Sequence, residues 1–158
     1  MPPSKSGQSA LSQPTAGILR AIVAFEDREE CGRLRLLRCG FRHCFCLVGA
    51  GSTWTLCDPL LSRIALMQVN GLTEAELLRE LEALGATVLR GEVPSGAHPV
   101  PIRLRPLSCV EIVKRILNLD LPWVLTPHQL HQALLRLRPH SRAFNRYHPQ
   151  TQGIDITL

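Results

Sequence analysis

Aromatic residues are scarce in this 158-residue sequence, at 4% of the total. The sequence also has no uninterrupted apolar segment near the ~18 residues that a membrane-spanning helix requires. It contains no internal repeat and no low-complexity segment. No compact apolar core with a small-residue cleavage site follows the polar start, Met1 to Gln13, so we expect no secretory signal and, by default, a cytoplasmic location. Together these absences indicate a soluble chain.

The composition is that of one ordinary domain. Apolar residues make up 45% and charged residues 20%, and a domain of this length buries roughly two-thirds of the surface of its unfolded chain. The six cysteines are expected to be reduced thiols, because a chain of this size without a secretory signal does not need a disulfide framework. The net charge of +5 permits a nucleic-acid partner but gives it only weak support.

The sequence divides into three parts. Residues 1–15 lack the apolar periodicity of a folded segment and predict a disordered N-terminal tail. Residues 16–137 contain the patterned segments and predict one domain. Residues 138–158 are basic, poorly periodic and interrupted by proline, and predict a C-terminal extension whose last residues, 153–158, form an edge strand.

The patterned part predicts strands and helices that give an α+β fold, in which an antiparallel sheet packs against helices. Glycine and proline bound most of the segments, and residues 49–52 form the turn of a hairpin. A helix from Thr126 as N-cap, with Pro127 at its first position, follows an extended segment over 121–125. The expected strands cover 17–25, 41–48, 53–58, 62–69, 86–90 and 100–104, and the expected helices cover 74–84, 109–117 and 127–137.

The helix that begins at Cys109 carries the first chemical signal. Ser108 is a good N-cap, Glu111 completes the pattern of a capping box, and Asn118 is the expected C-cap. A thiol in the first turn lies near the positive end of the helix dipole, where cysteine pKa values fall to roughly 3.5–7.5. Cys109 is therefore a candidate nucleophile, and a buried structural cysteine is the alternative.

Two further residues complete a catalytic constellation. A cysteine hydrolase needs a thiolate, an imidazole within hydrogen-bond reach and a polar group that orients the imidazole. His43 and Asp58 lie at similar distances from the hairpin turn, so we expect them to be cross-strand or diagonal neighbours. Taken singly, His43 reads as a core or edge histidine and Asp58 as a turn residue before proline.

The strings around these residues resemble the circularly permuted branch of the papain-like fold, which includes the lecithin:retinol acyltransferase-like and permuted NlpC-type hydrolases. The strings are Phe41-Arg-His-Cys-Phe45, Leu56-Cys-Asp-Pro59 and Leu107-Ser-Cys-Val-Glu111, in the order histidine, polar partner, cysteine. The resemblance covers roughly residues 38–119. It implies a papain-like domain over 16–137, with Cys109 as nucleophile, His43 as general base and acid, and Asp58 as the orienting group.

The expected activity is hydrolysis of an amide or ester bond in a peptide or small molecule, as in a thiol protease or amidase, with no cofactor or metal. Two departures from the family pattern bear on this. Several members use a second histidine where this chain has Asp58, and the asparagine-cysteine-glutamate string of the acyltransferase members is absent because Ser108 and Val110 flank Cys109. The second departure favours hydrolysis over acyl transfer.

Other classes of function remain open from the sequence. The domain could be papain-like without catalysis and serve as an interaction or structural module. A zinc module could use Cys31, Cys39, His43, Cys44, Cys46 and Cys57, but no C-x2-C pair occurs, and Cys44 and Cys46 share a strand face opposite to His43.

Basic and histidine residues near the end of the chain give weaker signals. The basic residues could form a phosphate-binding tail, although a solvated helix face is the more common explanation of such a pattern and no aromatic ladder accompanies them. The histidines show no metal-binding motif and are expected at the surface. The basic residues are Arg136, Arg138, Arg142 and Arg146, and the histidines are His128, His131, His140 and His148.

Overall fold

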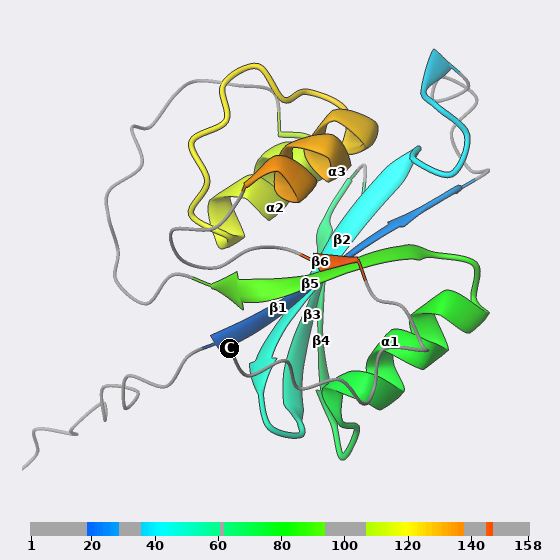
Figure 1. Ribbon diagram of the computed structural model, residues 1–158, viewed down its shortest axis with the longest axis vertical. Helices are drawn as coiled ribbons and strands as arrows, with labels where there is room; N and C mark the ends of the chain where they lie inside the picture. The colour runs from blue at the N-terminus through cyan, green and yellow to red at the C-terminus, as the bar shows by residue number, and fades with distance from the viewer. Residues whose placement is uncertain (1–18, 29–35, 61, 94–106, 138–144, 147–158) are drawn as a thin grey trace, which may run out of the picture.

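The computed structural model describes residues 19–28, 36–60, 62–93, 107–137 and 145–146. They form an α+β fold in which an antiparallel sheet of order β4-β3-β2-β1-β5-β6 packs against three helices (Figure 1). The expected α+β class and all the strands and helices expected within these ranges are confirmed. The strands are β1 Leu19–Glu26, β2 His43–Ala50, β3 Thr53–Pro59, β4 Ile64–Asn70, β5 Thr87–Val93 and β6 Asn145–Arg146, and the helices are α1 Glu74–Ala83, α2 Cys109–Ile116 and α3 Pro127–Arg136.

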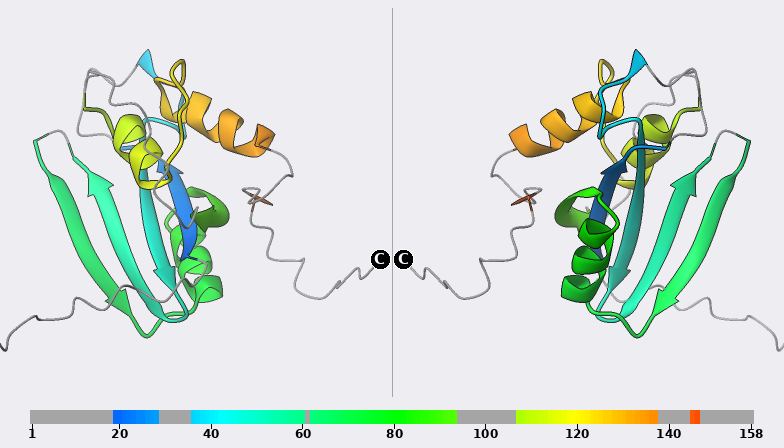
Figure 2. Two further views of the ribbon diagram at one scale, coloured as in Figure 1. Left: turned by 90° about the vertical axis from the view of Figure 1, so that its left-hand side faces the viewer. Right: turned by 90° about the vertical axis from the view of Figure 1, so that its right-hand side faces the viewer.

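The helices cover both faces of the sheet, so the molecule has three layers (Figure 2). Helices α2 and α3 pack on one face and α1 on the other. Strand β1 lies between β2 and β5, and its five residues Ala21 to Phe25 are fully buried. Burial on both faces explains why this segment is uniformly apolar rather than alternating, and why its periodicity does not distinguish strand from helix.

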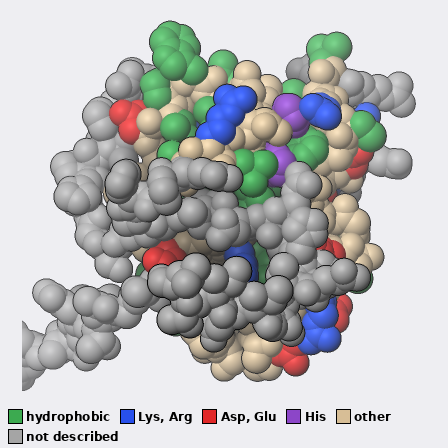
Figure 3. All heavy atoms as spheres, in the orientation of Figure 1, with side chains coloured by type: hydrophobic (Ala, Val, Ile, Leu, Met, Phe, Trp, Pro, Cys, Tyr) green, Lys and Arg blue, Asp and Glu red, His purple; other side chains and the backbone are tan. Residues whose placement is uncertain are grey.

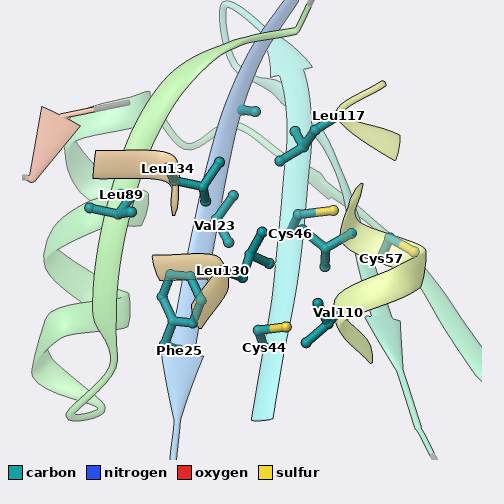
Figure 4. Packing of buried hydrophobic residues seen from close by; sticks show 12 residues of the cluster. Val23, Phe25, Cys44, Cys46, Cys57, Leu89, Val110, Leu117, Leu130 and Leu134 are labelled. Carbon is teal, nitrogen blue, oxygen red and sulfur yellow. The ribbon is translucent and has the colours of Figure 1, made fainter. Parts of the chain in front are cut away.

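The larger core cluster anchors the N-terminus of α2 (Figure 4). Val110 and Val113 of α2 and its C-cap residue Leu117 are buried against side chains of β1 and β2, and Leu130 and Leu134 of α3 complete the cluster. Burial of each aliphatic side chain contributes about 1.5–3 kcal/mol. Because Val110 follows Cys109 directly, this packing fixes the first turn of α2 and therefore the position of the thiol.

On the outer side of α2 and α3, the visible surface mixes hydrophobic, basic and histidine side chains (Figure 3).

The ends of α2 differ from the sequence prediction. The Ser108 hydroxyl accepts from the Glu111 N–H at 3.2 Å, as expected, but no reciprocal capping box forms. The Glu111 carboxylate lies 2.8 Å from Lys114 and 3.2 Å from Arg115, so these cations take the oxygens that would have reached back to Ser108. The C-cap is Leu117 rather than Asn118, because Asn118 follows it in the left-handed region with φ 54°.

Two other expectations were wrong. The segment over 121–125 contains a turn rather than being extended throughout, since the Val124 N–H donates to the Leu121 carbonyl oxygen at 3.2 Å. His131 is not a surface residue but is 1% exposed, and its ring lies 5.3 Å from that of Phe25 and 4.9 Å from that of Phe41. The sequence prediction failed because His131 lies one residue after Leu130 on the buried stripe of α3, where an imidazole packs as an aromatic ring.

Several expectations fall outside the described residues. These are the N-terminal tail over 1–15, the strands over 100–104 and 153–158, and the residues Cys31, Arg138, Arg142, His140 and His148. Strand β6 lies within the predicted extension over 138–158 and pairs with β5 through Arg146 and Leu89. In the part of the chain that is described, no helix is long and apolar enough to cross a membrane.

Candidate active site

His43 and Asp58 meet at one end of the sheet. His43 is the first residue of β2, and the β2–β3 register, with Cys46 opposite Cys57, sets His43 diagonal to Asp58. The His43 Nε2 lies 2.7 Å from the Asp58 Oδ1, and both side chains are buried. The expectation that they are neighbours is confirmed.

The Cys109 thiol lies at the N-terminus of α2, within hydrogen-bond contact of Cys44 and His43. The hydrogen bond from the Cys44 thiol has the largest effect on the Cys109 pKa. With the His43 imidazole and the Cys44 backbone N–H, it lowers this pKa from 9.0 to about 5, although burial opposes the change. With a pKa of about 5, Cys109 is a thiolate at neutral pH.

His43 links the thiol to the carboxylate. Burial acts to lower the pKa of His43, but hydrogen bonds and charge interactions with Cys109 and Asp58 outweigh it, so the pKa is raised above 6.5. Asp58 contacts the Nε2 atom of His43. The other ring nitrogen, Nδ1, is therefore the one that can contact the Cys109 thiol. The three residues thus form a continuous chain of contacts, in which the imidazole links the thiol to the carboxyl group.

An arginine that the sequence did not single out supports Asp58. The Arg28 guanidinium donates to the second carboxylate oxygen, Oδ2, at 2.7 Å, and its Nε forms an ion pair with the Glu26 Oε1 at 2.7 Å. Both oxygens of Asp58 are therefore engaged, one by His43 and one by Arg28. Arg28 follows β1 in an acidic segment, and only the pairing of β1 with β2 brings that segment beside Asp58.

Cys44 is the second residue that the sequence did not place at the site. Its side chain points to the α2 face of the sheet and is fully buried, whereas His43 belongs to the preceding position of the same strand. Its contact with the Cys109 sulfur raises the Cys44 pKa well above 9.0, so Cys44 stays protonated and acts as an S–H donor. The only sequence signal is its position next to His43.

The thiol faces a cavity of about 530 Å³, a volume typical of small-ligand sites. Apolar side chains form most of the cavity wall, and three arginines also line it. The lining residues are Arg28, Leu37, Arg42, His43, Pro59, Leu60, Ser62, Arg63, Leu107, Ser108, Cys109, Val110, Ile112, Leu125 and Pro127.

The residues that the sequence offered as zinc ligands do not form one cluster. Cys39 is exposed and its thiol donates to Asp27 at 3.0 Å, whereas Cys46 and Cys57 face each other across β2 and β3 in the core. Burial raises the pKa of Cys46 to about 12 and also raises that of Cys57. Among the described residues, no group of three or more His, Cys, Asp or Glu side chains is arranged to hold a metal ion.

Comparison of the chain with protein-family models, with curated proteins and with solved structures finds no match in any of the three.

Proposed function

We propose that this protein is a cysteine hydrolase that cleaves an amide or ester bond. The observation that carries the proposal is that His43 contacts both Cys109 and Asp58 beside an open cavity. A structural cysteine does not require an imidazole, a carboxylate and an adjacent cavity, whereas nucleophilic catalysis requires all three.

The arrangement also supports a permuted papain-like fold as part of the proposal. The order along the chain is histidine, aspartate, cysteine, and the histidine and aspartate lie on adjacent antiparallel strands while the cysteine begins a helix. This is the order of the permuted branch to which the sequence motifs are similar.

The first half of the reaction forms an acyl-enzyme. The Cys109 thiolate attacks the carbonyl carbon, and the resulting oxyanion accepts a hydrogen bond from the Cys109 N–H, which has no intrahelical acceptor at this first position of α2. The oxyanion then collapses, the bond to the leaving group breaks, and the His43 imidazolium gives its proton to the departing amine or alcohol. The acyl group remains on Cys109 as a thioester.

The second half returns the free thiolate. Neutral His43 takes a proton from a water molecule, whose oxygen attacks the thioester carbonyl, and the carboxylic acid product leaves as the C–S bond breaks. Asp58 holds the His43 ring in place through Nε2 and stabilises the imidazolium form, and Arg28 fixes the Asp58 carboxylate.

The test is the pH dependence of iodoacetamide alkylation, followed for each cysteine by mass spectrometry on the folded protein. Cys109 should react fully at pH 6, and its rate at this pH should fall in His43→Ala. Cys39 is an internal reference, because it is exposed and Asp27 raises its pKa, so it should react only at higher pH.

Selective alkylation of Cys109 would justify a screen of amide and ester substrates, with Cys109→Ser as the inactive control. If Cys109 reacts no faster than Cys39 at pH 6, or reacts only on unfolding, the proposal is wrong and the domain has a structural or binding role.

A further inference from the structure

Three arginines line the cavity beside Cys109, and no carboxylate does so among the described residues. The three differ in how their charges are balanced. Arg28 has two carboxylate partners, Glu26 and Asp58, each at 2.7 Å. Its charge is therefore neutralised within the protein, and it supports the catalytic group.

The positive charge of Arg42 is only partly neutralised by carboxylates of the protein. Among the described residues, its nearest carboxylate oxygen belongs to Asp27, at 3.7 Å, which is longer than a hydrogen bond. Asp27 already accepts from the Gly40 N–H at 2.7 Å and from the Cys39 thiol at 3.0 Å. The Nε of Arg42 is buried and has no hydrogen-bond partner in the described part of the chain, and a buried unsatisfied donor is costly unless a ligand or water pairs with it.

Arg63 has no carboxylate partner in the described ranges. It immediately precedes β4, and its carbonyl oxygen accepts from the Leu60 N–H at 2.8 Å, so a short turn after β3 holds it at the same end of the sheet as Asp58. The residue is exposed and lines the cavity, so its guanidinium is free to pair with a bound anion.

We infer that this cavity selects amide or ester substrates that carry an anionic oxygen group, a carboxylate or a phosphate, close to the scissile bond, with Arg63 and Arg42 as its binding groups. Leu107, Ile112 and Leu125 provide an apolar wall for the uncharged remainder of the substrate. This inference rests on the proposed hydrolase function and deepens it by naming the substrate class.

The charge preference can be measured without a known substrate. Iodoacetate and iodoacetamide alkylate a thiolate by the same displacement of iodide, but only iodoacetate carries a carboxylate. The ratio of their rate constants at Cys109 should exceed the ratio at Cys39 and fall about fivefold to tenfold in Arg63→Gln and in Arg42→Gln. The preference should also weaken as salt rises from 0.05 to 0.5 M.

Matched variants separate charge from other effects. Arg63→Lys should keep most of the preference because it keeps the charge. Arg79→Gln removes the same charge from an exposed site on α1, on the opposite face of the sheet, and should leave the ratio unchanged. His43 attracts iodoacetate equally in all these proteins. The change in the rate ratio from wild type to variant therefore reports the effect of the arginine alone.

Competing ligands distinguish the two anion classes. N-acetylglutamate, inorganic phosphate and the uncharged N-acetylglutamine amide are each added during alkylation by iodoacetamide. Protection by N-acetylglutamate that is lost in Arg63→Gln assigns the subsite to a carboxylate, and protection by phosphate that is lost in the same variant assigns it to a phosphate. N-acetylglutamine amide, which carries no charge, should not protect.

The failures of the two proposals are distinguishable. If iodoacetamide alkylates Cys109 rapidly at pH 6 but both glutamine variants keep the wild-type ratio, or neither anion protects, the anionic subsite is wrong and the hydrolase proposal stands. If iodoacetamide also does not alkylate Cys109 rapidly at pH 6, the hydrolase proposal itself is wrong.

Discussion

The contact between Cys44 and Cys109 predicts a specific change in the reactivity of Cys109. Cys44 has the largest effect among the groups that lower the Cys109 pKa to about 5. A hydrogen bond to a charged group contributes about 1.5–3 kcal/mol, and one pKa unit corresponds to about 1.4 kcal/mol. Cys44→Ala should therefore raise the pKa of Cys109 by about one to two units.

The change should have a clear pH signature. At pH 5.5, a rise of one to two units lowers the thiolate fraction about threefold to twenty-fivefold, and the rate of alkylation by iodoacetamide falls with it. At pH 8 both proteins are almost fully ionised at Cys109, so their rates should agree. Cys44→Ser, which keeps a donor of similar size, should lie between the wild type and the alanine variant.

Cys46→Ala is the matched control. Cys46 lies two residues along β2, is equally buried in the same cluster and pairs with Cys57 rather than with Cys109. Both alanine variants remove one buried sulfur, so circular dichroism and urea unfolding should report similar losses of stability. If folded Cys44→Ala alkylates with the wild-type pH profile, or if Cys46→Ala shifts the profile equally, the assigned hydrogen bond is wrong.

Three other predictions follow from the same geometry. Asp58→Asn should lower the pKa of His43 and reduce hydrolysis by about a hundredfold or more, whereas unchanged turnover would exclude an orienting role. The pH profile of hydrolysis should be bell-shaped, rising as Cys109 ionises near pH 5 and falling as His43 loses its proton above its raised pKa; a rate that keeps rising to pH 9 would contradict this. Leu130→Ala should lower the free energy of unfolding by about 2–5 kcal/mol in urea, because Leu130 is fully buried in the cluster that anchors α2.

The parts of the site that sequence predicted are set by local signals. The hairpin of β2 and β3 follows from a glycine-rich turn between two β-forming runs, and the turn alone fixes the approximate register of His43 and Asp58. The helix start at Cys109 follows from the Ser108 cap. Both signals lie within a few residues of the groups that they place.

The parts that sequence missed depend on contacts between distant segments. Arg28 reaches Asp58 only because β1 pairs with β2, and Cys44 reaches Cys109 only because α2 packs at the start of β2. The burial of His131 likewise depends on rings contributed by β1 and by the segment before β2. No spacing in the sequence encodes these contacts, so sequence patterns alone could not have named them.

The placement of the site at the end of β2 explains how one thiol reaches both partners. Consecutive residues of a strand point to opposite faces, and in the middle of a sheet a group on one face cannot contact both. His43 begins the strand, and α2 starts beside this end, so Cys109 can contact the imidazole from one face and the Cys44 thiol from the other. Burial disfavours the thiolate, and the contacts with Cys44 and His43 outweigh that effect. The same end of the sheet carries Arg63 beside the cavity, so the groups proposed to bind an anion lie in the cavity that Cys109 also lines.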